Sequence, residues 1–315
     1  MQSIKIGISR CLLGDPVRYN GGHKKDDFLV NTLGRYVTFV PVCPEVECGL
    51  PVPRESMRLM GDPDRPRLVT HNTKIDLTDR MTAWCRRRLE ELETEDLSGF
   101  IFKKNSPSSG LFRVKVYTES GMPGRVGSGI FAKAFTEHFP LIPVEEEGRL
   151  NDPLLREIFI EQIFTMARWR RLVQEQKTMA GIIDFHTRNK LLILSHSPTV
   201  HRQMGKLVAG GKSLPMEALY QDYKELLMKA LRLKPTAKKN TNVLMHMMGY
   251  FKKDLSSDEK QELLEIFEQY RTGKIPLIVP ITLVNHYVRK YDNDYLEQQT
   301  YLNPHPLALQ LRNHA

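Results

Sequence analysis

The chain has 315 residues, of which 41% are hydrophobic and 26% are charged, and it contains four cysteines. This composition is typical of a soluble globular protein and excludes a disordered chain, and no stretch approaches the roughly 18 consecutive apolar residues that a membrane-spanning helix needs. Four scattered cysteines are too few for a secreted disulfide scaffold, and the N-terminus lacks the pattern of a leader peptide. We therefore expect a cytoplasmic protein with free thiols and no membrane association.

Positive charge is concentrated in the second half of the chain. The formal net charge is +9, with 22 Lys and Arg against 20 Asp and Glu in residues 1–150, and 24 against 17 in residues 151–315. A basic half attracts polyanions such as RNA. A solvated basic surface without a partner is an equally good interpretation of the charge alone.

Short apolar segments alternate with segments of helical periodicity in the first half. Strand, helix, strand in this order predicts an α/β domain with a parallel sheet and flanking helices. We expect strands at residues 3–9, 37–43, 97–104 and 140–148, and helices at residues 25–36, at residues 77–93 with Thr78 as the cap, and at residues 125–139.

Chemically useful residues follow three of the expected strands. Cys11 comes after the first strand, Cys43 and Glu45 come after the second, and the segment KKNSPSSG at residues 103–110 comes after the third. Ligand sites on parallel sheets lie at the carboxyl ends of the strands. We therefore expect these residues to meet at one edge of the sheet.

The segment VCPEVECGLPVPRE at residues 42–55 concentrates thiols and carboxylates. Its prolines and glycine predict an irregular, rigid loop, and such a loop can hold soft ligands around iron or zinc. Cys43 is alternatively a buried core thiol. Glu45 is either a general acid or base, or a surface carboxylate or a partner for Arg54. Cys85, in contrast, occupies an apolar position of an expected helix and is predicted to pack in the core.

The serines of residues 103–110 predict a tight turn together with the proline and glycine beside them. Its exposed backbone N–H groups can cradle an anion or a substrate, although a turn without a ligand is the commoner outcome. The GSG at residues 127–129 is far short of a dinucleotide fingerprint, so no such cofactor is expected.

From about Leu150 onward the periodicity is helical throughout. We therefore expect two domains, residues 1–150 and residues 151–315, of which the second is all-α. The basic segment at residues 236–253 interleaves lysines with amide and aromatic side chains, a combination that suits RNA, while core packing explains its apolar residues equally well. The expected helices are residues 152–174, 179–196, 215–233, 241–253, 256–273 and 280–291.

Several histidines and arginines of the second half allow two interpretations. The histidines lack a compact metal-binding spacing, which favours packing or surface positions. Arg168 and its basic neighbours either contact RNA or pack. The histidines concerned are His186, His196, His201, His246 and His286.

Three segments resemble the signature motifs of the thiouracil desulfurase family. They are ISRCLLGDPVRYNGGHK, VCPEVECGLPVPRE and KKNSPSSG, and the usual family forms are S-x-C-L-L-G-x-x-x-R-Y-x-G, C-P-E-x-x-x-G-L-x-x-P-R and S-P-S-C-G. The second half, with TNVLMHMMGYFKK at residues 241–253, is similar to a helical domain that is found alone or fused to that desulfurase domain. The combination resembles bacterial two-domain tRNA thiouridine desulfidases and covers nearly the whole chain.

The resemblance implies a [4Fe-4S] cluster held by three cysteines, with one iron left open to bind the sulfur of a thiolated pyrimidine. Carried onto this chain, Cys11 and Cys43 match two of the family cysteines. Glu45 matches a carboxylate that manages protons, and Ser106 or Ser108 helps to position substrate or protons. The implied reaction replaces sulfur by water-derived oxygen without net redox change.

Ser109 stands where the family motif has its third cysteine. A hydroxyl is a much poorer iron ligand than a thiolate. Three interpretations stay open: the chain has lost a ligand and holds an unstable cluster, Cys48 acts as the third ligand, or Ser109 ligates weakly.

The resemblance implies an iron–sulfur enzyme that converts thiouridine in tRNA to uridine, and the charge of the basic helical half is consistent with contacts to RNA phosphates. An enzyme that acts on free thiouracil is the first alternative, and a non-catalytic RNA-binding protein with a decayed cluster site is the second. The sequence predicts neither the modified tRNA position nor the oligomeric state.

Overall fold

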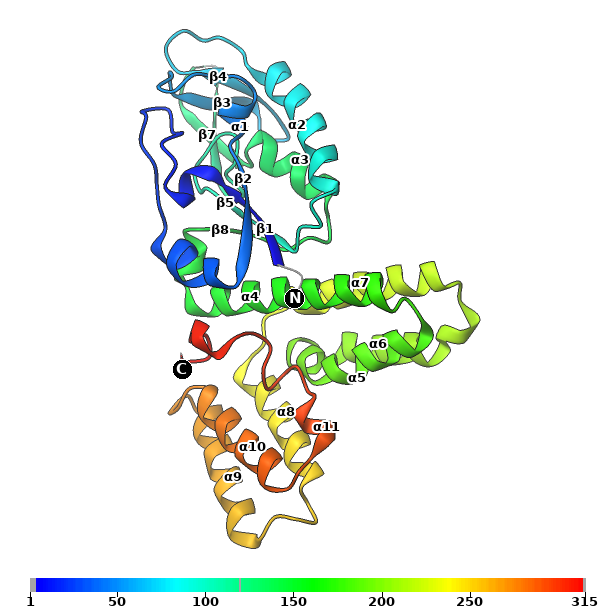
Figure 1. The fold of residues 1–315 in the computed structure, drawn as a ribbon. Coiled ribbons are helices and arrows are strands. Elements are labelled where there is room, and N and C mark those ends of the chain that lie inside the picture. The colour runs from blue at the N-terminus through cyan, green and yellow to red at the C-terminus, as the bar shows by residue number, and fades with distance from the viewer. Residues whose placement is uncertain (1–3, 119, 314–315) are drawn as a thin grey trace. The chain divides into compact units, whose positions relative to one another are not determined.

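A computed structural model describes residues 4–118 and 120–313 of the chain. The chain divides into two compact units, Met1–Leu155 and Arg156–Ala315. Figure 1 shows strands and helices in the first unit and helices in the second. The α/β class of the first half and the helical class of the second, both predicted from the sequence, are confirmed.

The predicted parallel sheet forms the centre of the first unit. Its strands are ordered β2-β1-β5-β8, and every neighbouring pair is parallel. The register places Ser9 opposite Val42, at the last residues of two strands. The segments that follow these strands therefore begin at the same edge of the sheet. The strands are β1 (Ile4–Ser9), β2 (Val37–Val42), β5 (Gly99–Phe102) and β8 (Val144–Glu146).

Aromatic side chains join this sheet to the helices α2 (Thr78–Glu93) and α3 (Ile130–His138). The ring of Phe100 lies 4.7 Å from that of Phe135, and Trp84 lies 5.3 Å from Phe131, measured between centroids. The close approach of Phe100 to β1 requires Gly7, because a Cβ there would lie 2.2 Å from the ring. Packing of this kind fixes β1 and β5, and hence the loops that follow them.

A second sheet, ordered β4-β3-β6-β7, was not predicted. Its short, partly exposed strands lie between turn-forming residues, which hide them from an analysis of apolar periodicity. Two pairs are antiparallel and β3 pairs with β6 in parallel. The strands are β3 (Met57–Asp62), β4 (Arg65–Thr70), β6 (Val114–Tyr117) and β7 (Pro123–Gly127).

Four local predictions for the first unit were wrong. Residues 25–36 contain only a π turn at Phe28–Thr32 and a 3-10 turn at Leu33–Arg35, and the helix expected at 125–139 starts five residues later, after β7. The prolines after Cys43 do not exclude helix, because Pro44 occupies the first turn of α1 (Pro44–Glu47), where its missing N–H costs nothing. Thr78 does not cap α2, since its hydroxyl accepts the Leu68 N–H at 2.8 Å.

Helices account for the second half, and all six that were predicted are present. The helices α6 and α11 were missed. The helices are α4 (Pro153–Glu175), α5 (Met179–His196), α6 (Pro198–Gly210), α7 (Met216–Leu231), α8 (Ala237–Tyr250), α9 (Ser257–Arg271), α10 (Ile278–Lys290) and α11 (Asp294–Glu297), with 3-10 turns at Arg149–Asn151, Gly211–Ser213 and Leu307–Leu309. None of the helices in the described ranges is long and apolar enough to cross a membrane.

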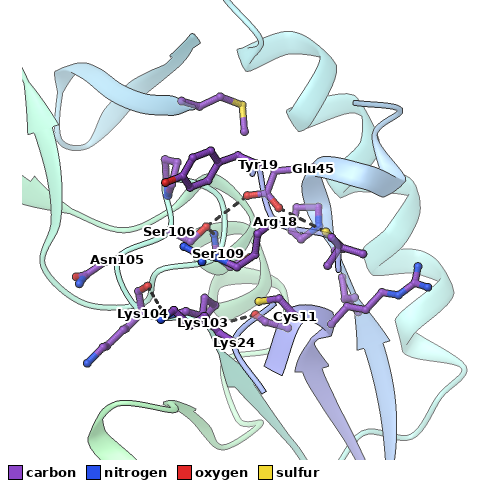
Figure 2. Close-up of a pocket in the computed structure, with 18 of the residues that line it drawn as sticks. Cys11, Arg18, Tyr19, Lys24, Glu45, Lys103, Lys104, Asn105, Ser106 and Ser109 are labelled. Atoms are coloured by element: carbon purple, nitrogen blue, oxygen red, sulfur yellow. Dashed lines mark hydrogen bonds between the residues drawn. The ribbon is translucent and has the colours of Figure 1, made fainter. Parts of the chain in front are cut away.

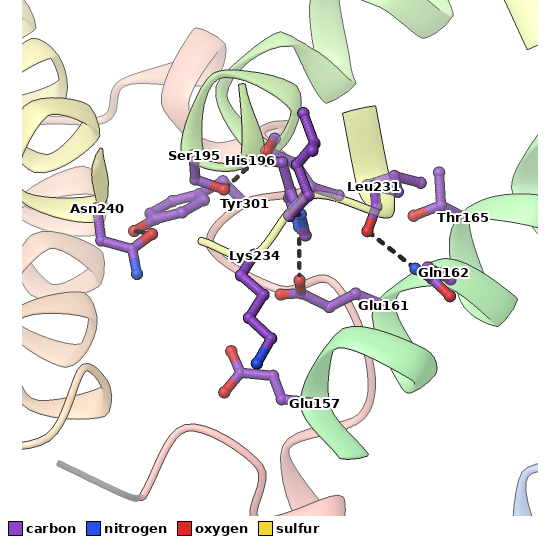
Figure 3. A network of polar contacts seen from close by, with 12 residues as sticks. Glu157, Glu161, Gln162, Thr165, Ser195, His196, Leu231, Lys234, Asn240 and Tyr301 are labelled. Atoms are coloured by element: carbon purple, nitrogen blue, oxygen red, sulfur yellow. Dashed lines mark hydrogen bonds and ion pairs between the residues drawn. The ribbon is translucent and has the colours of Figure 1, made fainter. Parts of the chain in front are cut away.

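Buried charges hold the C-terminal segment against α4 and α5. Glu161 accepts a hydrogen bond from Arg312 at 2.8 Å and lies 3.1 Å from the His196 ring nitrogen, as Figure 3 shows for the histidine. Arg312 also donates to Glu157 at 3.2 Å. Burial and the Glu161 carboxylate raise the pKa of Glu157 to about 8. Burial alone would raise the pKa of Glu161 too, but His196 and Arg312 lower it to about 2.

Candidate active site

Three loops enclose a cavity of about 350 Å³ at the carboxyl edge of the main sheet (Figure 2). They follow β1, β2 and β5, as the sequence predicts. The predicted residues that line the cavity are Cys11, Cys43, Glu45, Ser106 and Ser109. Residues far apart in the chain thus share one site.

Cys11 is held by a turn that directly follows β1. Arg10–Leu13 form a 3-10 turn that ends at Gly14, whose φ of 105° lies in the left-handed region. The Cys11 carbonyl accepts the Lys24 N–H at 2.9 Å, which ties the turn to the next part of the loop. The side chain is buried, and burial together with the Glu45 carboxylate raises the pKa of the Cys11 thiol to about 11.

Cys43 is placed by the start of α1. It is the N-cap residue, and its N–H donates to the Glu47 carboxylate at 2.7 Å. Burial, and next the Glu45 carboxylate, raise the pKa of the Cys43 thiol to about 12. Both cavity cysteines are therefore protonated near pH 7, unless a bound cation compensates the charge of their thiolates.

The Glu45 carboxylate contacts two hydroxyls, a thiol and a guanidinium at the site. Its Oε1 accepts hydrogen bonds from the hydroxyls of Ser108 and, at 3.4 Å, Ser106. Its Oε2 lies 3.6 Å from both the Cys43 sulfur and the Arg54 guanidinium. The pairing of Glu45 with Arg54 that the sequence suggested is therefore present, and the same carboxylate also faces the Cys43 thiol.

The serine loop is a compact turn, which orders its hydroxyl groups. Ser106 Oγ accepts the backbone N–H groups of Ser108 at 3.3 Å and Ser109 at 3.1 Å. Gly110 is required next, because a Cβ there would lie 2.4 Å from a Val114 methyl group. Ser109 is only 3% exposed and lines the cavity. Ser108 reaches the site through its bond to Glu45.

Cys48 is not brought to the cavity. It follows α1, and its sulfur lies 3.3 Å from the Glu45 carbonyl oxygen while its side chain packs against the apolar cluster that contains Cys85. Cys85 is buried there, as predicted. Within the described residues, no group of three or more His, Cys, Asp or Glu side chains is arranged to hold a metal ion. The cavity thus offers two thiols and one hydroxyl at the positions where the sequence resemblance implies three cysteines.

Basic and aromatic residues line the same cavity, and apart from Lys103, which lies in the predicted segment 103–110, they were not predicted as part of it. Figure 2 shows Arg18, Tyr19, Lys24 and Lys103 around the thiol and carboxylate groups. Lys103 pairs with Glu147, and the Arg18 guanidinium lies 5.6 Å from the centre of the Tyr19 ring. Their position in two of the three loops could have predicted them, because loop residues next to expected ligands share the site.

Comparisons with known proteins assign a family to each half. The sequence model of the 2-thiouracil desulfurase family matches residues 6–147. The model described as a protein of unknown function, DUF1722, matches residues 190–306. The chain belongs to the 2-thiouracil desulfurase and DUF1722 families. The resemblance seen in the sequence motifs is thereby confirmed.

Two individual proteins are similar to parts of this chain. "Uncharacterized protein YbgA" of Escherichia coli (strain K12) is 31% identical over 153 residues, which are 48% of this chain and 90% of that protein. A solved structure titled "[4Fe-4S]-dependent thiouracil desulfidase TudS" is 30% identical, with a TM-score of 0.40, and the match covers 48% of this chain and 95% of that one. Each relative therefore corresponds to about half of the two-domain chain.

Proposed function

We propose that the 2-thiouracil desulfurase domain removes sulfur from a thiolated pyrimidine with the help of an iron–sulfur cluster. The observation that carries this proposal is the cavity in which two buried thiols, Cys11 and Cys43, lie beside the Glu45 carboxylate. The sequence resemblance implies the cluster, and the thiouracil desulfidase that shares 30% of its residues with this chain depends on one.

Two of the three donor groups at the cavity are the thiols that such a cluster needs, and the third is a serine hydroxyl in place of a thiol. Clusters of this class are held by cysteine thiolates, whose negative charge the iron compensates. Cys11 and Cys43 would supply two thiolates, and the buried Ser109 hydroxyl is the third group at the same cavity. An oxygen ligand binds iron less well than sulfur does. We therefore propose Cys11, Cys43 and Ser109 as the holding residues, with a cluster that is more easily lost than a three-cysteine one.

When bound, the cluster supplies a Lewis acid that polarises the C–S bond of the substrate. We propose that Glu45 accepts a proton from the water that attacks the carbon of this C–S bond. The hydrogen bonds from Ser106 and Ser108 and the ion pair with Arg54, which hold its carboxylate, support this role. Water contributes the oxygen, sulfur leaves as sulfide, and no electrons are exchanged. The product is the uracil base.

We propose thiolated uridine in tRNA as the substrate. The basic residues of the cavity and the +7 formal charge of residues 151–315 support an RNA partner, because phosphate contacts dominate the affinity for nucleic acids. Free 2-thiouracil is a second candidate, since the description of the matching family names that base.

The first test is the iron and acid-labile sulfide content of the full chain after anaerobic reconstitution, measured beside Ser109→Cys and Cys48→Ser. We expect a cluster in all three, with the slowest loss of iron in air for Ser109→Cys. Loss of the cluster in Cys48→Ser alone would instead make Cys48 the third ligand. No iron in any of them would contradict the proposal and favour an RNA-binding protein with a decayed site.

The second test is turnover of the reconstituted protein on 2-thiouracil, the thiolated nucleoside and thiolated tRNA. We expect the highest kcat/KM for tRNA, and a dependence on salt that the free base does not show. Preference for the free base would leave the desulfurase proposal intact and remove tRNA from it.

A further inference from the structure

A second cavity lies in the helical unit and is lined by residues of α5, α6 and α8. These three helices are labelled in Figure 1. Its volume is about 420 Å³. Leu191, Leu194 and Pro198 give it an apolar wall, and none of its described lining residues is acidic. Polar and aromatic groups complete it: Lys190, His201, Arg202, Asn242, His246 and Tyr250.

The positive charges of this cavity are not neutralised by carboxylates. Lys190 lies 4.8 Å from the centre of the Tyr295 ring, and Arg202 donates to the Pro198 carbonyl oxygen at 3.4 Å. Within residues 4–118 and 120–313, neither the Lys190 nor the Arg202 side chain forms an ion pair. A cavity with two such charges and no acidic lining attracts an anionic ligand.

One of the two histidines at the cavity, His201, stacks on the ring of His186. The His201 ring lies 6.2 Å from the His186 ring at an interplanar angle of 21°, and His186 shares a hydrogen bond of 3.1 Å with the Tyr223 hydroxyl. Burial and the Lys190 charge lower the pKa of His201 below its usual value. His201 is therefore a hydrogen-bonding group at neutral pH rather than a further charge.

Tyr250 provides a fixed aromatic surface beside these groups. Its ring stacks on Tyr295 at 4.7 Å and 21°, yet 44% of Tyr250 remains exposed. A ring supported on one side and open elsewhere can stack with a nucleobase at little cost in side-chain entropy. The cavity thus combines a site for a planar ring with sites for an anion.

We propose that this cavity binds one nucleotide, with its phosphate at Lys190 and Arg202 and its base against Tyr250. Asn242 and His201 are the neutral groups available to the base or sugar. The inference deepens the RNA part of the proposed function and rests on it for the source of the nucleotide, which we take to be an RNA strand. Free nucleotide is the other source of the same chemistry.

The test uses the full chain, a labelled oligouridylate and unlabelled UMP. Arg202→Glu should weaken oligouridylate binding at least about tenfold and reduce the slope of log affinity against log salt by about 0.7, which is the contribution of one single-strand phosphate. Tyr250→Ala should weaken oligouridylate binding by about 5- to 150-fold without changing that slope. Tyr250→Phe keeps the ring and should bind with wild-type affinity. Lys229→Glu, an exposed charge reversal on α7 outside the cavity, is the matched control and should change affinity less than about twofold.

Equal losses for Arg202→Glu and Lys229→Glu, or wild-type binding by Tyr250→Ala, would overturn the proposal. UMP binding that depends on Tyr250, without binding of the oligouridylate, would support the nucleotide site and assign it to free nucleotide. Sulfur release from free 2-thiouracil should be unchanged in every variant. If the wild-type chain releases none while oligouridylate binding still depends on Tyr250, then the proposed function fails and the nucleotide site stands.

Discussion

Each half of the chain has one group of neighbouring ionisable side chains. The two groups differ in whether protein partners enclose them completely or a cavity borders them. In the helical half, the Glu161 carboxylate is fully buried and both of its oxygens have protein partners, His196 and Arg312. In the α/β half, Glu45 has protein partners as well, but the thiols beside it line a cavity, with pKa values that burial raises. A closed cluster, a fully enclosed group of charges, stabilises the fold, whereas an open one, a group that borders a cavity, leaves room for a ligand.

The largest effect should follow from removing the negative charge of Glu45, beside the cavity thiols. We expect Glu45→Gln to retain iron and sulfide after reconstitution and to lower kcat for 2-thiouracil by about 10²- to 10⁴-fold, which is the usual contribution of a general acid or base. Glu95→Gln, which removes a surface carboxylate paired with Lys5, is the matched control and should leave kcat unchanged. Wild-type kcat in Glu45→Gln would assign the proton transfer to another group.

A substitution among the buried charges Glu157, Glu161 and Arg312 should change the stability of the fold. Arg312→Met leaves Glu161 and Glu157 buried without their cation, and we expect it to lower the free energy of unfolding of the helical unit by about 3–5 kcal/mol. Arg271→Met breaks an exposed pair with Glu268 and should cost less than about 1 kcal/mol. Amide exchange in α4 and α5 under mild denaturant measures the loss of unfolding free energy in each of the two variants. Similar exchange in the two variants would show that the buried network contributes little.

The closed cluster also predicts a dependence of stability on pH. The folded-state pKa of Glu157 is raised to about 8 from an ordinary value of 4.5, so this group binds its proton more tightly in the folded state. Its contribution is complete below pH 4.5 and is lost as the pH rises towards 8, with a slope of up to about 1.4 kcal/mol per pH unit.

Glu157→Gln should therefore flatten the fall in unfolding free energy between pH 4.5 and pH 8. Glu161→Gln is the opposite control. Because the pKa of Glu161 is lowered to about 2, its contribution is present above pH 4.5 and is lost as the pH falls towards 2. Denaturant titrations across this range separate the two carboxylates, and an unchanged slope in Glu157→Gln would place the proton elsewhere in the network.

The open site could largely be predicted from the sequence because its residues stand next to strand ends. Cys11, Cys43 and the serine loop each follow an apolar segment directly, and parallel strands carry such segments to one edge. The position of Cys48 could not be predicted from spacing. A turn of helix begins at Pro44 and separates the two cysteines, so that Cys43 lines the cavity while Cys48 packs against the apolar cluster of Cys85.

The closed network was less accessible to sequence reasoning. Arg168 was left between RNA contact and packing, but it is half-buried and donates to the Pro304 carbonyl oxygen at 2.8 Å. Arg312 lies more than a hundred residues from its carboxylate partners. Neither partner is marked by periodicity, since a charged residue on a predicted helix is usually solvent-exposed. Long-range pairing of buried charges is a property of the tertiary structure alone.

The smallest predicted effect concerns Thr78, where the sequence predicted a helix cap. Its hydroxyl accepts the Leu68 N–H of β4, while the Asp76 carboxylate accepts the Thr78 N–H at 2.9 Å. Thr78→Val should therefore cost about 1 kcal/mol by leaving the Leu68 amide without a partner, and should speed hydrogen exchange at Leu68. Asp76→Ala should instead speed exchange at the first turn of α2 and leave Leu68 protected. If Thr78→Val frayed α2 and spared Leu68, the hydroxyl would act as the cap that the sequence predicted.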